Sequence, residues 1–154
     1  MDRYDKTIKE IRKFNRFYTV NMGFLDSGCL DTTYSIAEMR ILFEIKTHGT
    51  CAQSDITKNL HIDKSYLSRI VTRLCKNGLI EKDRSAKDKR ITCITLTEKG
   101  TMETERLIDL TDDQIRAQIV QLNLDECEKL CNAMNAVITI LGKEETSENG
   151  NYTV

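Results

Sequence analysis

Basic and hydroxyl-bearing side chains in the middle of the chain have the types and spacing that suit binding to a phosphate backbone. Residues 64–73 read KSYLSRIVTR, and a second basic run, RSAKDKR, occupies residues 84–90. From Lys58 to Lys99 there are eleven Lys or Arg residues against five carboxylates, a net charge of +6, although the whole chain carries −1. Because cations collected on one small substructure attract polyanions, this segment is a candidate nucleic-acid-binding site.

A short helix and a β-hairpin are the elements that must position these residues. Asp63 is a suitable N-cap for the helix, and Gly78 is suited to end it. The strand-like runs 79–84 and 90–96 flank a charged turn, which predicts a hairpin. Apolar residues at helical spacing are expected to face inward: Leu67, Ile70, Val71 and Leu74.

The segment before this helix predicts a helix-turn-helix. A shorter helix is expected at about residues 52–60, with a capping box between Thr50 and Gln53 or a start two residues later. Asn59 to Ile62 would then connect the two helices. Since an α-helix fits the major groove of duplex DNA, exposed residues of the second helix are expected to reach base edges or phosphates. The predicted contacts on the two helices are Ser54, Lys64, Ser65, Tyr66, Ser68, Arg69 and Arg73.

The charged hairpin adds cations that phosphates or a minor groove would accept. The predicted contacts there are Arg84, Lys87, Lys89 and Arg90. Asp88 is expected to order the turn by holding an arginine through a charge-assisted hydrogen bond. A basic surface that is merely solvated is the simpler alternative. The helix-turn-helix spacing, the polar helix face, the adjoining hairpin and the clustered cations together favour DNA binding.

The rest of the chain predicts long helices, in line with the absence of proline. An aromatic stripe runs along residues 2–22, and Ser35 and Glu38 form a capping box for a second helix that ends at Gly49. A long helix is expected from Thr97 to about Val120, and a last one from Asn123 or Asp125 to Leu141. The predicted fold class is mainly α with a small β-hairpin (α+β), followed by a polar, flexible tail at residues 142–154.

Residues 83–100, DRSAKDKRITCITLTEKG, resemble the wing of the multiple antibiotic resistance regulator (MarR) family of winged helix-turn-helix transcription factors. The resemblance extends over about residues 4–141 and includes the helix DKSYLSRIVTRLCKNGLI. It implies one MarR-like domain over 1–154, with the winged module at about 34–97 and dimerisation helices at about 2–22 and 98–141. The implied protein is a homodimer that binds a pseudo-palindromic operator in double-stranded DNA. The wing residues at family positions are Arg84, Asp88, Arg90, Leu96, Thr97 and Gly100.

The resemblance also implies regulation, because members of the family commonly respond to small ligands, oxidants or metals. We therefore expect a transcriptional repressor that a small-molecule effector releases from DNA. Cys29 is the best placed thiol for oxidation, although no cation adjoins it in the sequence. Aromatic residues at helical spacing are more often core, but six residues could line an effector pocket: Phe14, Phe17, Tyr18, Tyr34, Met39 and Phe43.

Other classes of protein are less well supported by the sequence. There is no nucleophile–base pair, phosphate loop or metal-ligand cluster, so we expect neither an enzyme nor a bound metal or cofactor. The charged N-terminus and the lack of a long apolar run predict a cytoplasmic protein with free thiols and no membrane segment. Cys127 and Cys131 could seat a soft metal, but buried core thiols are the simpler reading. The alternative function is a winged-helix module for protein interaction.

Overall fold

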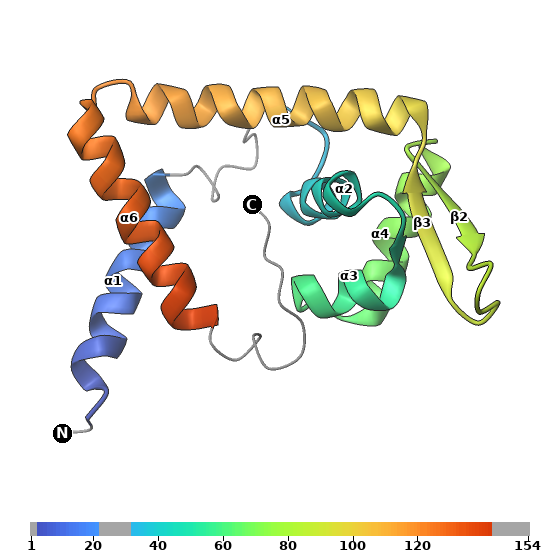
Figure 1. Cartoon of the computed structure of the whole chain (residues 1–154), viewed down its shortest axis with the longest axis horizontal. Coiled ribbons are helices and arrows are strands. Elements are labelled where there is room, and N and C mark those ends of the chain that lie inside the picture. Colours follow the sequence, from blue (N-terminus) through green and yellow to red (C-terminus); the bar gives the residue numbers. More distant parts are fainter. Residues whose placement is uncertain (1–2, 22–31, 143–154) are drawn as a thin grey trace. The chain divides into compact units, whose positions relative to one another are not determined.

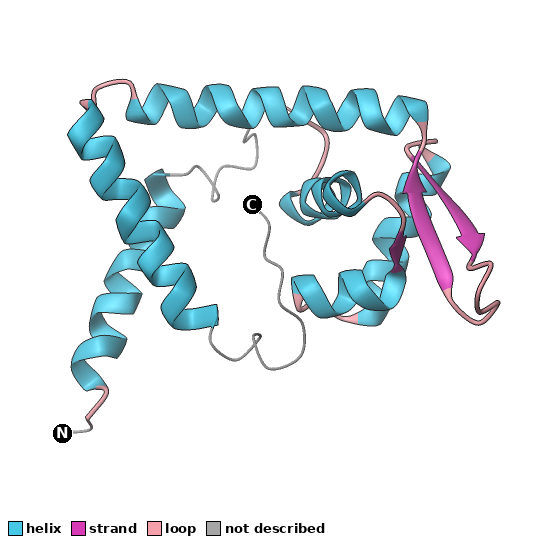
Figure 2. Cartoon of the chain, viewed as in Figure 1, coloured by secondary structure: helices cyan, strands magenta, loops and turns pink. Residues whose placement is uncertain are grey.

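Helices form most of the chain, and three strands form one small antiparallel sheet (Figures 1 and 2). The computed structural model describes residues 3–21 and 32–142. This arrangement confirms the predicted mainly-α fold with a β-hairpin wing. In chain order the elements are α1 (Asp5–Asn21), α2 (Ile36–His48), β1 (Cys51–Ala52), α3 (Gln53–Leu60), α4 (Lys64–Lys76), β2 (Ile80–Arg84), β3 (Thr92–Leu96), α5 (Glu98–Ile119) and α6 (Leu124–Leu141).

The chain divides into two compact units, Met1–Ile115 and Arg116–Val154, and α5 continues across the boundary. A single domain over residues 1–154 stays a prediction, as do the limits of the winged module and of the dimerisation helices. Cys29 and all of the predicted tail except Gly142 lie outside the described residues. No helix within the described ranges is long and apolar enough to cross a membrane.

Helix α2 begins and ends as its sequence predicts. The Ser35 hydroxyl accepts a hydrogen bond from the Glu38 amide at 3.2 Å, and Glu38 Oε2 accepts one from the Ser35 amide at 2.8 Å. This reciprocal pair is a capping box, which satisfies two amide groups that a helix start would otherwise leave open. Gly49, at φ +75°, ends the helix and donates its amide to the Ile45 carbonyl at 2.8 Å.

The hydrophobic core of the first unit lies among α2, α3, α4, the sheet and α5. All four apolar residues expected to face inward from α4 are buried, which confirms the predicted helix face. They pack in one cluster with α2 residues such as Ile41 and Leu42, with Ile94 of β3 and with Leu107 of α5. Burial of these side chains holds α4 in place and leaves its polar face at the surface.

The sheet contains a strand that was not predicted. Its strand order is β1-β3-β2, with Cys51 opposite Ile94 and with Ile80 opposite Leu96. The predicted hairpin is therefore confirmed, and β3 lies in the middle because the two-residue strand β1 pairs with it. Pairing between β1 and β3 joins segments about forty residues apart, so no local pattern announces it.

Helix α3 ends at Leu60 as predicted, but its start and the connection that follows it differ from the prediction. The Thr50–Gln53 capping box is wrong, because Ala52 is the N-cap and makes no side-chain cap hydrogen bond. The predicted connection is also too long, because Asn59 and Leu60 still belong to α3. His61 turns the chain in a left-handed conformation at φ 49°, which shortens the connection to residues 61–63.

The start of α5 is bonded to the turn that follows α4. The Thr97 amide donates to the Leu79 carbonyl at 3.0 Å, and the Thr97 hydroxyl donates to the Gly78 carbonyl at 2.7 Å. Lys99 Nζ also donates to the Asn77 carbonyl at 2.8 Å. Gly100 permits this approach, because a Cβ at that position would lie 1.8 Å from the Leu79 carbonyl oxygen. The end of α4 and the start of α5 thus form one hydrogen-bonded junction.

Helix α6 keeps its apolar stripe at the surface of the chain. Asn123 caps it through a capping box with Glu126, which decides between the two predicted starts. No residue of α6 is buried in the described chain. Buried core thiols are not confirmed within the single chain, where Cys131 is exposed and Cys127 is only partly covered.

Candidate nucleic-acid interface

The predicted contact residues of α4 share its exposed face. Asp63 caps the helix, and its Oδ1 accepts hydrogen bonds from the amides of Ser65 at 2.9 Å and Tyr66 at 3.0 Å. This cap fixes the N-terminal turn, where a groove-binding helix meets DNA. Ser54 is exposed on the neighbouring helix α3. The exposed residues of α4 include Lys64, Ser65, Tyr66, Ser68, Arg69 and Arg73.

Tyr66 orients Arg69 on this face. The Arg69 guanidinium lies over the Tyr66 ring, 5.7 Å from the ring centroid, in a cation–π contact one turn along the helix. The Tyr66 side chain remains 40% exposed. Contact with the ring restricts the rotamers of Arg69, while no acidic partner in the described chain neutralises its charge.

Arg73 has a different environment, which the sequence did not predict. Its Nε lies 3.2 Å from Oε1 of Glu38 in α2, an ion-pair distance, although the N–H does not point well enough to make a hydrogen bond. The Glu38 side chain is 2% exposed and that of Arg73 is 58% exposed. Thirty-five positions separate the two residues, so only the folded chain brings them together. Glu38 was predicted solely as part of a capping box.

The wing turn is ordered through backbone amides. Asp88 Oδ1 accepts from the Arg90 amide at 2.9 Å, and the Ile91 amide donates to the Asp88 carbonyl at 3.0 Å. Asp88 therefore touches an arginine, but it binds the main chain of that arginine and not a guanidinium as expected. Ser85 was also missed: its hydroxyl accepts from the amides of Lys87 at 3.2 Å and Asp88 at 3.4 Å. A serine three residues before an aspartate in a turn is the signal that could have identified it.

Four cations surround this ordered turn and extend the basic surface of α4. Each is exposed, and none has an ion pair among the residues that the structure covers. With their charge unneutralised and the main chain fixed, they can contact a phosphate backbone with little reorganisation. They are Arg84, Lys87, Lys89 and Arg90.

The six residues predicted to line an effector pocket have different environments. Met39 is buried in the hydrophobic core, and Tyr34 and Phe43 are partly buried and pack against that core. Phe14 and Tyr18 stack on α1 with ring centroids 5.5 Å apart. The remaining aromatic residue of that helix, Phe17, is 64% exposed. Their role in ligand binding stays a prediction.

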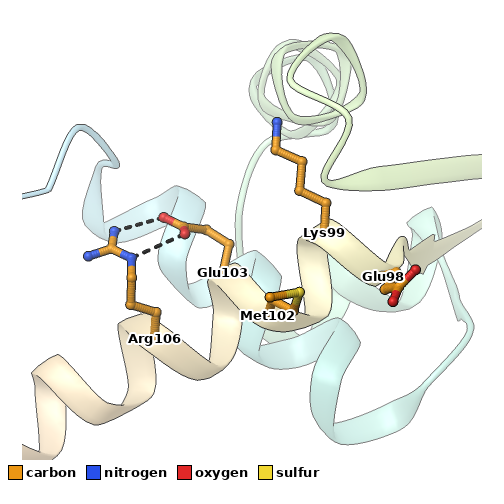
Figure 3. Close-up of a pocket in the computed structure, with 5 residues that line it drawn as sticks. All are labelled: Glu98, Lys99, Met102, Glu103 and Arg106. Atoms are coloured by element: carbon orange, nitrogen blue, oxygen red, sulfur yellow. Dashed lines mark hydrogen bonds and ion pairs between the residues drawn. The ribbon is translucent and has the colours of Figure 1, made fainter.

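A pocket of about 600 Å³ opens along the first half of α5 (Figure 3). None of the six predicted residues is among those that line it, which are Glu98, Lys99, Met102, Glu103 and Arg106. Arg106 donates two hydrogen bonds to Glu103, Nε to Oε2 at 3.1 Å and Nη2 to Oε1 at 2.7 Å (Figure 3).

Charges and burial shift pKa values around this pocket. The hydrogen bond from Arg106 holds the pKa of Glu103 below its usual value, because it favours the ionised carboxylate. Burial raises the pKa of Tyr34, and the neighbouring carboxylate of Glu103 adds to that rise. Carboxylate, ammonium and guanidinium groups thus lie beside the Met102 side chain in one open pocket.

Comparison with known proteins gives a family-model match over the segment that carries this interface. Residues 34–92 match the model of the MarR family. The chain is 31% identical over 86 residues to the HTH-type transcriptional regulator YwhA of Bacillus subtilis, covering 56% of this chain and 62% of YwhA. It is 33% identical over 72 residues to the HTH-type transcriptional regulator BilQ of Clostridium symbiosum, covering 45% of this chain and 50% of BilQ. These relatives are named as transcriptional regulators, not enzymes, and the chain spans half to just over six tenths of their length.

Solved structures share the fold over most of the chain. A mutant of E. coli MarR complexed with operator DNA matches with a TM-score of 0.71 and 22% identity, covering 90% of this chain and 99% of that one. BpsR of Bordetella bronchiseptica, a protein whose DNA binding is regulated by 6-hydroxynicotinic acid, matches with a TM-score of 0.68 and 19% identity. That match covers 84% of this chain and 98% of BpsR.

Proposed function

We propose that the protein is a transcriptional regulator of the MarR family, whose model matches residues 34–92, and that it binds specific sequences in double-stranded DNA. The observation that carries the proposal is the exposed basic face of α4 beside an ordered, cationic wing. The α4 side chains would read the major groove, and the wing would contact phosphates or the minor groove.

We further propose that the regulator acts as a homodimer on a pseudo-palindromic operator. Separate apolar stripes on α1 and α6 support it. On α1, Ile8, Ile11 and Phe14 are each more than 40% exposed, and on α6 Val137 and Ile138 are 44% and 57% exposed. Leaving such stripes in water is unfavourable, whereas a second copy of the chain would bury them. Two copies of α4 would then address two half-sites.

The finer proposal is a repressor released by a small-molecule effector, as a relative such as BpsR is regulated by 6-hydroxynicotinic acid. The pocket along α5 supports a binding place near the α4–α5 junction, since Lys99 both lines the pocket and bonds to Asn77. An effector that displaced Lys99 would loosen the attachment of the helix that reads DNA. The basic and acidic residues that line the pocket suit a small, polar organic ligand.

Selection of duplexes from a random-sequence pool, followed by fluorescence anisotropy at several salt concentrations, tests DNA binding. Wild type should enrich particular sequences, and its affinity should fall steeply with salt because bound cations release counterions. Arg69→Ala with Arg90→Ala should weaken binding and flatten the salt dependence, by about 0.9 in slope for each phosphate that is no longer neutralised. Lys129→Ala, which removes an α6 cation paired with Asp125, is the control.

Equal affinities for the wild type and the double variant would refute the DNA-binding proposal. That result would favour the alternative, a winged-helix module that binds another protein. Sedimentation of the free protein tests the dimer separately, and a monomer at micromolar concentration would contradict it.

A further inference from the structure

Glu38 carries more charge than its capping role requires. Its Oε2 accepts the Ser35 amide, which completes the capping box. A neutral glutamine would satisfy the same amide, because either side chain serves at this position of a capping box. The other oxygen, Oε1, is buried and accepts no hydrogen bond from any residue of the described chain. A buried carboxylate oxygen without a partner is unfavourable and therefore needs an explanation.

Arg73 supplies the compensating charge. Its Nε lies 3.2 Å from Oε1, and Glu38 is almost fully buried while the arginine side chain is more than half exposed. Because the Glu38 carboxylate is almost fully buried, its attraction for the Arg73 charge holds the guanidinium against α2. Oε1 accepts no hydrogen bond from the guanidinium, so this ion pair leaves the N–H donors of Arg73 available.

We propose that Glu38 is a positioning residue for DNA recognition: it holds Arg73 by its Nε side and so presents the terminal amino groups of the guanidinium to a guanine edge. The inference rests on the proposed function. An arginine fork can bond the O6 and N7 atoms of guanine in pairs, provided that its plane is fixed. Arg69 is oriented by an aromatic ring, whereas Arg73 is oriented by a buried charge. The two arginines of α4 thus depend on different supports.

Glu38→Gln is the direct test, because it keeps the capping box and removes the charge. The probes are a duplex enriched by the wild-type protein from a random pool and a duplex of permuted sequence. The ratio of the two affinities should fall about tenfold in the variant, the scale of one bidentate contact. The melting temperature should stay close to that of the wild type. Glu44→Gln on the same helix, where the carboxylate bonds to Asn59, is the matched control and should leave the ratio unchanged.

A double-mutant cycle separates positioning from general structural support. If Glu38 acts through Arg73, Glu38→Gln should have no further effect on the ratio once Arg73→Ala is present. Arg73→Lys should reduce the ratio as much as Glu38→Gln does, because one ammonium group cannot face Glu38 and a base edge together. This lysine variant also tests the inference if Glu38→Gln does not fold.

Two outcomes overturn the inference and a third removes its basis. An unchanged ratio in Glu38→Gln, or independent effects of the two substitutions, would show that Glu38 only supports the fold. Failure of the wild type to enrich any sequence would instead refute the proposed function. Since that result is seen before any variant is compared, the two failures are distinguishable.

Discussion

Replacing Gly100 by alanine should loosen the junction between α4 and α5. In an ordinary helix interior this change would stabilise the protein by about 1 kcal/mol, because alanine is the better helix former. Here the new Cβ would lie 1.8 Å from the Leu79 carbonyl oxygen and 2.7 Å from its carbon. Ordinary contact requires a separation near 3.4 Å, so the two backbones must move apart by more than an ångström.

That movement breaks the bonds of the junction. The Thr97 amide and hydroxyl donate to the Leu79 and Gly78 carbonyls, and each hydrogen bond is worth about 1 kcal/mol. Overpacking of the close approach costs about 2 kcal/mol more. After the gain in helix propensity is subtracted, the unfolding free energy should fall by roughly 3 kcal/mol. For a domain of this size, that corresponds to a fall of about 10 °C in the melting temperature.

Circular dichroism during thermal and urea unfolding measures the effect. Gly142→Ala is the matched control, since a Cβ there meets no atom within 4 Å. It should change the melting temperature by no more than a degree or two. If Gly100→Ala proved as stable as the wild type, the close approach of α5 to Leu79 would be wrong, and with it the argument that α5 anchors the end of α4.

Three further changes have defined outcomes. Asp63→Ala should lower the unfolding free energy by about 1 kcal/mol in urea titrations, because two α4 amides lose their acceptor, whereas Asp63→Asn should retain most of it. Burial raises the pKa of Cys51 to about 11 from a usual value of 9.0, so the folded state should lose stability as the pH rises from 9 to 11. Cys51→Ala should remove that part of the decline when the unfolding free energy is measured against pH in denaturation curves. The same decline in the variant and in the wild type would contradict this expectation. The lowered pKa of Glu103 should stabilise the folded protein at pH values above 4.5, the usual pKa of a glutamate, and this stabilisation should be lost as the pH falls below 4.5. Arg106→Ala should weaken this acid dependence, which thermal melts of both proteins from pH 3 to 6 would reveal.

Features set by neighbouring residues could be predicted from the sequence. The caps by Ser35, Asp63 and Asn123 depend on side chains bonding to amides two or three residues away. The buried face of α4 follows from helical spacing alone. The polar face of α4 and the hairpin were also predictable, because each depends on residues that lie close together in the sequence. Together they define most of the candidate interface.

Features that join distant segments could not be predicted. Strand β1 exists because Cys51 and Ala52 pair with β3, and that pairing displaced the start expected for α3. The position of Arg73 depends on Glu38, which only the packing of α2 near α4 brings within 3.2 Å. The exposure of Cys131 could not be predicted either, because an apolar stripe on a helix does not reveal which part of the chain, if any, covers it.

The order of the sheet has a consequence for self-association. Because β3 lies in the middle of the sheet, β1 and β2 are the edge strands. The unpaired backbone amides of an edge strand can form hydrogen bonds with a strand of another molecule. Strand β1 is only two residues long, and four consecutive charged residues, EKDR, follow Ile80 in β2. Short length and charge are both means of discouraging edge-to-edge aggregation. Arg84 therefore keeps the wing soluble as well as basic, and its replacement by an apolar residue would promote aggregation through β2 even where no DNA is present.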